Sequence, residues 1–403
     1  MLAGTCSVAC HSKVYVLPGS IRTRSPTSQP EGQTYSASDW KSPHVPSHWV
    51  SICTSVPLRL NVNAGRSGLS HHVEMYEDGK GAFDFDKLAE TVRLAVRQLD
   101  RVIDRNFYPI ESARRGNLRW RPVGLGVMGL QDVFFRLRLP FDGEQARALS
   151  ASIAAAVYFH ALDTSCELAV ERGRHPAFGD TRAVSGALQF DAWNVVPDDV
   201  DRWEALRERI RTHGLRNSLL IAIAPTATIA SIAGCYECVE PQVSNLFKRE
   251  TLSGDFLQVN RYLVEELKKL GLWTPEIRDA IKQAEGSVQG VARIPDSLRA
   301  IYRTAWEIPM RSLIDMAAAR GAYIDQSASL NLFMESPNIG AMSSMYMHAW
   351  KQGIKTTYYL RSRPATKIAK TTLGEAVEAS APYTPEEALA CSLENPEACE
   401  ACQ

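Results

Sequence analysis

The sequence predicts an α/β fold built on a mainly parallel sheet, either open or closed into a barrel. Short apolar runs, notably 218–224 and 355–360, alternate with longer stretches of helical periodicity. Strands that alternate with helices are usually joined by crossover connections and pair in parallel. The 403 residues are 45% hydrophobic, which is enough to bury the core of one large α/β domain or of two ordinary ones.

The charge balance and the cysteine content limit the partners and the compartment. Lys plus Arg and Asp plus Glu both number 45, which gives no electrostatic case for binding nucleic acid or an acidic membrane surface. The nine cysteines are an odd number spread along the chain, as expected in a reducing compartment. We find no apolar run near the roughly 20 residues of a membrane span and no signal-peptide pattern. We therefore expect a cytoplasmic protein.

Residues 1–68 predict an irregular segment rather than a domain. Residues 1–73 contain 13 Ser and 6 Pro but only two acidic side chains, and they lack helical or strand periodicity. The ordinary alternation of helices and strands starts close to Leu69. We expect the folded domain to span 69–364.

Helical periodicity predicts a series of helices in that domain. Asp84 can cap a helix whose apolar positions, from Leu88 to Ile103, repeat every 3.6 residues. A long Ala-rich helix is predicted over 144–172, where Gly173 can form the C-cap. Further helices are predicted over 199–212, 260–270, 296–320 with a break at Pro309, and 341–352.

The segment 124–129 matches G-x-G-x-x-G, the dinucleotide-binding fingerprint. That fingerprint needs an apolar strand before it and an acidic residue about 20 positions later. Here a basic, proline-ended run over 118–122 precedes it. Glycines that allow close packing of the backbone are therefore the preferred interpretation.

The strongest candidate ligand site follows the apolar strand 218–224. Pro225 and the short helical pattern after it place a helix start at the carboxyl end of a strand. Unpaired N–H groups and the helix dipole suit such a turn to phosphate. The donors would be the backbone amides of Thr226, Ala227, Thr228 and Ile229. The alternative is a helix capped by its own Thr226 or Thr228 without any ligand.

Two Cys-x-x-Cys pairs occur, one over 235–238 and one over 399–402. The tail 365–403 has no sustained apolar periodicity and contains three prolines, which predicts a flexible end that carries Cys399 and Cys402. Such a dithiol can form a disulfide and exchange with another one. A zinc site or incidental cysteines remain alternatives there. A joint four-thiolate site is disfavoured, because about 160 residues separate the pairs, and Cys235 and Cys238 are more typical of a buried structural pair.

Adjacent tyrosines, Tyr358 and Tyr359, lie in the run predicted to be a strand. In a regular strand successive side chains face opposite sides, so one ring would be in the core and the other at the surface. If the strand ends or bends there, the two rings could stack and exchange a hydrogen atom or an electron. The sequence leaves both alternatives open.

Taken together, these segments resemble the large, catalytic subunit of class I ribonucleotide reductase, from roughly Leu69 to Gln403. The stretches that carry the resemblance are 121–132, 213–218, 224–229, 252–256, 324–331 and 355–361. The resemblance implies the C-terminal part of a ten-stranded α/β barrel. It also implies reduction of ribonucleoside diphosphates by radical chemistry, for the synthesis of deoxyribonucleotides.

The resemblance assigns a role to each of these motifs. The loop from Pro225 to Ile229 would bind the substrate diphosphate, and Tyr358 and Tyr359 would relay a radical from a small, metal-containing subunit. Cys399 and Cys402 would reduce the active-site disulfide and be recharged by thioredoxin or glutaredoxin. The family implies no directly bound cofactor here, and in its full-length form ATP and dATP effectors and a homodimer.

The chain also departs from the family pattern. The Asn-x-Cys-x-Glu loop that carries the radical cysteine has no match; Cys238-Val-Glu240 comes closest, but position 236 is Tyr. Cys53 is a weak candidate for the second reducible cysteine. The first barrel strands and the nucleotide-sensing domains should precede residue 69. We therefore expect a C-terminal portion that does not turn over alone. The alternative is a catalytically inactive nucleotide-binding module derived from the same family.

Overall fold

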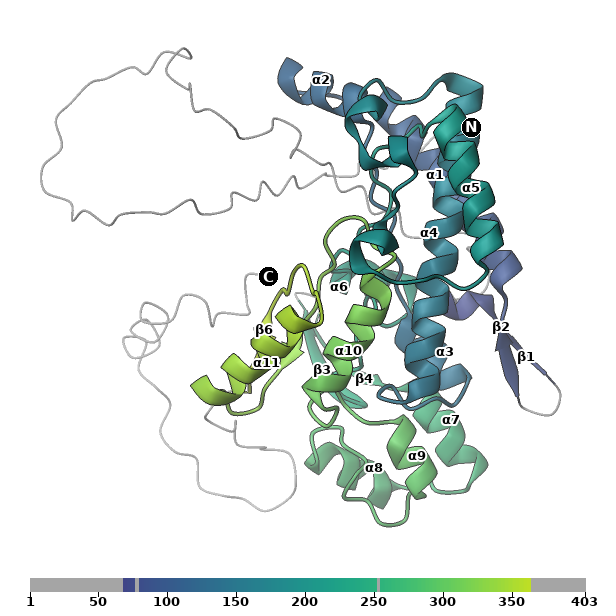
Figure 1. The fold of residues 1–403 in the computed structure, drawn as a ribbon. Helices are drawn as coiled ribbons and strands as arrows, with labels where there is room; N and C mark the ends of the chain where they lie inside the picture. The colour runs from purple at the N-terminus through teal and green to yellow at the C-terminus, as the bar shows by residue number, and fades with distance from the viewer. Residues whose placement is uncertain (1–67, 77–79, 252–253, 364–403) are drawn as a thin grey trace, which may run out of the picture. The chain divides into compact units, whose positions relative to one another are not determined.

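The computed structural model describes residues 68–76, 80–251 and 254–363 (Figure 1). Every element named below lies in one compact unit that ends at Ser362. The predictions for residues 1–67, which include Cys53, and for the tail with Cys399 and Cys402 lie outside the described residues.

Helices dominate the described residues. They are α1 (Phe85–Arg105), α2 (Glu111–Trp120), α3 (Leu130–Arg136), α4 (Glu144–Arg172), α5 (Val200–His213), α6 (Ala227–Ala233), α7 (Arg261–Lys269), α8 (Pro275–Gln283), α9 (Asp296–Ile301), α10 (Met310–Gly321) and α11 (Ile339–Lys351). Short 3-10 helices cover Leu69–His72, Phe178–Asp180, Arg182–Ser185 and Gln189–Trp193.

The strands are short and form three two-stranded pairs. The antiparallel pairs are β1 (Val73–Met75) with β2 (Gly81–Phe83), and β3 (Leu246–Thr251) with β4 (Gly254–Val259); β5 (Leu332–Phe333) and β6 (Leu360–Arg361) are parallel.

Helices α1 and α4 pack side by side at the centre of the unit (Figure 1). The Asp84 carboxylate accepts the N–H of Lys87 at 2.8 Å, so it caps α1 as the sequence predicts. Leu88, Val92 and Leu99 lie on the buried stripe of α1. Helix α4 is long and apolar enough to cross a membrane by length and composition, but 72% of that window is buried, as in a core helix.

Extended segments that are far apart in sequence lie side by side and form the parallel part of the fold. Isolated parallel bridges join Leu125 to Ile221 and Ile223 to Ala328, and the segment that starts at Ala328 continues into β5, which pairs with β6. The order in space is therefore 123–125, 218–224, 326–333 and 358–361. Helices and parallel segments together make an α/β fold that corresponds to part of a barrel.

The predicted strand boundaries were too long. Residues 218–224 are extended but form only isolated bridges. Of the run 355–360, only Leu360 lies in a strand, as the first residue of β6. One cause is local: the Asp325 carboxylate accepts the N–H groups of Leu220 and Ile221, both at 2.8 Å. Because these two N–H groups donate to a side chain, they are not available for the backbone hydrogen bonds of a longer strand.

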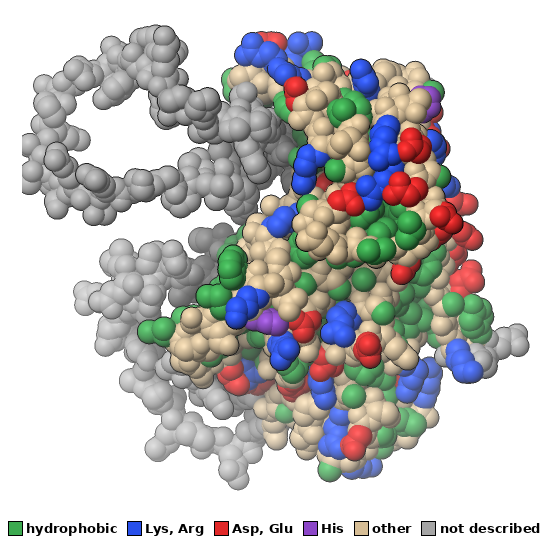
Figure 2. Space-filling view, viewed as in Figure 1, with side chains coloured by type: hydrophobic (Ala, Val, Ile, Leu, Met, Phe, Trp, Pro, Cys, Tyr) green, Lys and Arg blue, Asp and Glu red, His purple; other side chains and the backbone are tan. Residues whose placement is uncertain are grey.

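The helix predictions were correct for α1, α4, α5, α7 and α11 within a few residues. The break predicted at Pro309 within 296–320 is confirmed, because α10 begins at Met310; the break is longer than predicted, since α9 already ends at Ile301. Helices α2, α3 and α8 and the hairpins β1–β2 and β3–β4 were not predicted from the sequence. On the face shown in Figure 2, basic and acidic side chains are interspersed, in keeping with their equal numbers.

The glycine motif serves backbone packing. A Cβ added at Gly126 would lie 2.7 Å from the carbonyl oxygen of Ala222, in the neighbouring extended segment. Gly129 has φ +85° and precedes α3. This confirms the interpretation in terms of close packing.

Candidate functional site

The candidate phosphate turn lies where the central extended segment ends. Pro225 is exposed, Thr226 is the N-cap residue of α6, and Ala227 and Thr228 are exposed in its first turn. The N–H of Ala230 donates to the carbonyl oxygen of Thr226 at 2.7 Å, which closes that turn. The amides of the first helical residues precede this bond, and their N–H groups point away from the helix body.

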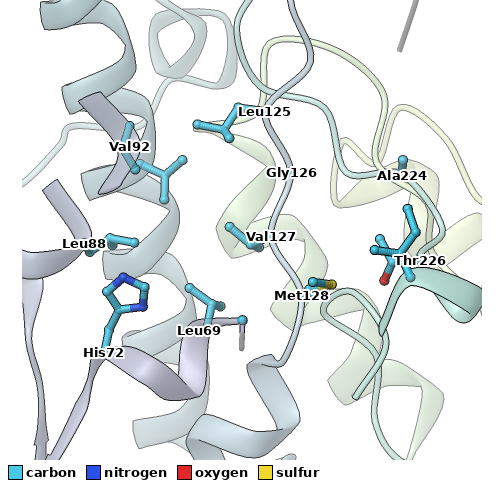
Figure 3. A pocket seen from close by; sticks show the side chains of 13 residues that line it. Leu69, His72, Leu88, Val92, Leu125, Gly126, Val127, Met128, Ala224 and Thr226 are labelled. Carbon is cyan, nitrogen blue, oxygen red and sulfur yellow. The ribbon is translucent and has the colours of Figure 1, made fainter. Parts of the chain in front are cut away.

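The turn borders a pocket, shown in Figure 3. Ala224, Thr226 and Ile229 line part of it. The other lining residues are mostly apolar and come from the segment 125–128, from α1 and α4, and from the 3-10 helix before β1 with the glycine that precedes it. His72 is the ionisable residue of this lining. Burial lowers its pKa to about 4, so the ring is neutral at neutral pH. The side chains that line the pocket therefore carry no formal charge at neutral pH.

The Thr226 hydroxyl does not cap α6 in the way the ligand-free alternative requires. It accepts the N–H of Cys238 at 2.7 Å and donates to Cys238 Sγ at 3.5 Å. The Cys238 thiol in turn donates to the carbonyl oxygen of Ala224. The side chain that could have capped the helix is thus used to hold the turn against Cys238.

The pair Cys235 and Cys238 is buried to different degrees. Cys238 is 1% exposed and Cys235 is partly buried, and burial raises the pKa of both thiols, that of Cys235 to about 12. Both therefore carry their protons at neutral pH, which agrees with a structural pair. Among the residues that the structure describes, we find no group of three or more His, Cys, Asp or Glu side chains placed to hold a metal ion.

A buried polar cluster beyond Cys238 was not predicted. Glu240 accepts the N–H of Asn331 through Oε1 at 3.2 Å, and the guanidinium of Arg320 donates to Ser150 Oγ at 3.1 Å. Burial raises the pKa of Glu240 to about 7 and lowers that of Arg320 to about 10. The only sequence signal was the partial Cys-x-Glu match at 238–240.

Replacing Glu240 with Gln should change how stability depends on pH. The folded pKa of about 7 exceeds the ordinary value of 4.5, so the folded state binds the proton more tightly, and wild-type stability falls as pH rises from 4.5 through 7. Glutamine does not titrate. The free energy of unfolding of Glu240→Gln should therefore rise relative to that of wild type by about 3 kcal/mol as the pH is raised from 4.5 to 8. Urea unfolding at several pH values measures this difference. A constant difference between the two proteins would contradict the assignment.

The two adjacent tyrosines contact each other. Their ring centroids are 4.0 Å apart with an interplanar angle of 52°, and Tyr358 Oη donates to Tyr359 Oη at 3.1 Å. Strand β6 begins only at Leu360, so the alternation of a regular strand does not apply to the pair. Tyr359 is 46% exposed, and the two rings are tilted against each other rather than stacked.

Comparison with known proteins supports one family. The family described as "Ribonucleotide reductase, barrel domain" matches residues 62–360. The chain is 44% identical to a ribonucleoside-diphosphate reductase large subunit of Arabidopsis thaliana (79% of this chain, 41% of the relative). It is 40% identical to one of Danio rerio (88% and 44%).

A solved structure agrees with the sequence comparison. The chain resembles the class Id ribonucleotide reductase alpha subunit of Actinobacillus ureae with a TM-score of 0.55 and 26% identity, over 68% of this chain and 46% of that one. The chain spans about two fifths of the length of the relatives named above. It belongs to the family of class I ribonucleotide reductase large subunits, of which it represents a part that includes barrel-domain sequence.

Proposed function

We propose that this chain supplies the diphosphate-binding and radical-relay part of a ribonucleoside-diphosphate reductase large subunit. The observation that carries the proposal is the turn from Pro225 to Ile229. It is exposed, it lies at the carboxyl end of a parallel segment and it borders a pocket. Its backbone amides would donate to the diphosphate oxygens, and the apolar wall formed by residues 125–128 would lie beside the rest of the nucleotide.

The remaining roles follow from family membership. Tyr358 and Tyr359 would pass a radical from a small, metal-containing subunit, and their phenol contact supports this role. Cys399 and Cys402 would return electrons to the active site, with thioredoxin or glutaredoxin as the reductant. We place the protein in the cytoplasm, where thiols stay reduced, and expect ATP and dATP regulation and a homodimer only in the full-length form.

Turnover by the 403 residues alone is not expected. Substrate reduction in the family starts at a radical cysteine in Asn-x-Cys-x-Glu, and the sequence contains no such pattern. The chain with a small subunit and a dithiol reductant should form no deoxyribonucleotide. The names of the relatives favour this reductase role over a nucleotide-binding module without redox function.

Substitution of an exposed residue in the turn tests the diphosphate site. Thr228→Asp adds a negative charge beside the amides, where it repels phosphate but suits the helix dipole, whereas Thr228→Asn is the neutral control. Calorimetric titration with CDP should show binding by wild type and Thr228→Asn, and affinity lower by about tenfold or more in Thr228→Asp. Equal affinities in all three proteins, or no binding of CDP by wild type, would overturn the proposal.

A further inference from the structure

We propose that residues 238–240, which we name the bridge segment, hold the diphosphate turn and the tyrosine pair in a fixed mutual arrangement. Cys238 and Glu240 are the positioning residues at its two ends. The inference rests on the proposed function, because that function gives the turn its ligand and the tyrosines their role.

At the first end, Cys238 is attached to the turn by three hydrogen bonds. Its N–H donates to the Thr226 hydroxyl at 2.7 Å, that hydroxyl donates to Sγ at 3.5 Å, and the thiol donates to the carbonyl oxygen of Ala224. These bonds hold residues on both sides of Pro225. The direction in which the following amides point is therefore determined by Cys238.

At the second end, Glu240 is attached to the segment that pairs with the tyrosines. Glu240 Oε1 accepts the N–H of Asn331 at 3.2 Å, and Asn331 Oδ1 accepts the N–H of Tyr359 at 3.4 Å. The N–H of Tyr358 donates to the carbonyl oxygen of Leu330 at 2.9 Å. Two hydrogen bonds in series thus connect the bridge segment to the backbone of the pair.

The residue at each end of the bridge segment has a feature that lowers the stability of the fold. Cys238 has φ +41°, a conformation that side-chain-bearing residues rarely adopt. Glu240 is 7% exposed, and its Oε2 has no hydrogen-bond partner among the described residues. A buried acceptor and a left-handed backbone persist where the surroundings impose them, and they occur preferentially at functional sites. Val239, 5% exposed, packs into the main core between them.

Variants at each end test the proposal at pH 6, where Glu240 carries its proton. Cys238→Ser keeps a donor and an acceptor, and Glu240→Gln keeps the acceptor for Asn331; both should bind CDP as wild type does. Cys238→Ala removes the two hydrogen bonds that join Sγ to the turn, and Glu240→Leu removes the one that Oε1 accepts. Each variant should bind CDP about fivefold more weakly. Cys235→Ser, in the same motif but outside these bonds, is the matched control.

The double variant separates one connected segment from two independent contacts. If the bridge segment acts as a unit, Cys238→Ala with Glu240→Leu should bind CDP only about fivefold more weakly than wild type, whereas independent sites would give about 25-fold. Glu240→Leu leaves the buried N–H of Asn331 without an acceptor, so its unfolding midpoint should fall, and binding is therefore compared at a temperature where every variant is fully folded. Under that condition, an affinity loss that Glu240→Gln shares, or a 25-fold loss in the double variant, would overturn the proposal.

Hydrogen exchange of the ligand-free chain gives a second readout that does not depend on nucleotide binding. Cys238→Ala should accelerate amide exchange in residues 224–230, and Glu240→Leu should accelerate it in residues 330–334 and 358–361. Unchanged exchange in both regions would overturn the bridge segment even if CDP binds. Failure of wild type to bind CDP would instead overturn the proposed function, while the exchange data would still decide the inference.

Discussion

Replacing Asp100 with alanine should lower the free energy of unfolding by about 3–5 kcal/mol. Its carboxylate is fully buried and accepts from Arg121 at 2.7 Å, and it lies 3.4 and 3.5 Å from Arg216 and Arg172. Asn217 donates to it at 3.3 Å. Removing Asp100 leaves a guanidinium that is only 4% exposed without its closest buried counter-charge, and Asp104 alone must then pair with it.

The Asp100 network also leads to the site. It joins α1 and α4 to Asn217, the residue directly before the segment that delivers the turn. Urea unfolding of Asp100→Ala measures the loss. Asp180→Ala is the control, because Asp180 pairs with Arg119 at 3.0 Å on the surface and both side chains are more than half exposed. Its effect should stay below about 1 kcal/mol. A similar small loss in both variants would contradict a structural role for the buried network.

Replacing Asp325 with alanine should lower the free energy of unfolding by about 2–6 kcal/mol. The Asp325 carboxylate accepts the N–H groups of Leu220 and Ile221, both from fully buried residues. Each buried donor left without a partner costs about 1–3 kcal/mol. The substitution should also weaken binding of the diphosphate, because these two residues lie four to five positions before Pro225 in the segment that carries the turn.

Asp325→Asn is the graded control for this prediction. One amide oxygen remains as an acceptor, so the variant should lose about half as much stability as Asp325→Ala. Chemical unfolding gives the stabilities. Titration with CDP should give affinities that decrease in the order wild type, Asp325→Asn, Asp325→Ala. If Asp325→Ala unfolds like wild type, the carboxylate does not hold the strand.

Local signals made part of this fold predictable. The apolar stripe and the Asp84 cap identified α1, and the strand followed by Pro225 identified the turn. Helix α2 could not be found in this way, because Asn117 is its only buried residue. In α3 six of the seven residues are buried, including Gln131 and Asp132, so it has no polar face to produce periodicity.

The contacts of the candidate site depend on distant parts of the chain. Glu240 and Asn331 are 91 residues apart, and Asn331 and Tyr359 are 28 apart. A pattern read over one or two helical turns cannot predict such pairs. The tyrosine contact was left open for a related reason: whether the rings meet depends on where β6 starts, and pairing with β5 decides that.

In the proposed function, the backbone of the Thr226–Ile229 turn receives a diphosphate. The most direct measurement is the amide spectrum of the chain, labelled with ¹⁵N in Thr, Ala and Ile, during titration with CDP. We predict saturable downfield shifts of the amide signals of Thr226, Ala227, Thr228 and Ile229, reproduced by pyrophosphate and weak with cytidine. Signals in this turn that stay unmoved, while others shift on binding, would contradict the account.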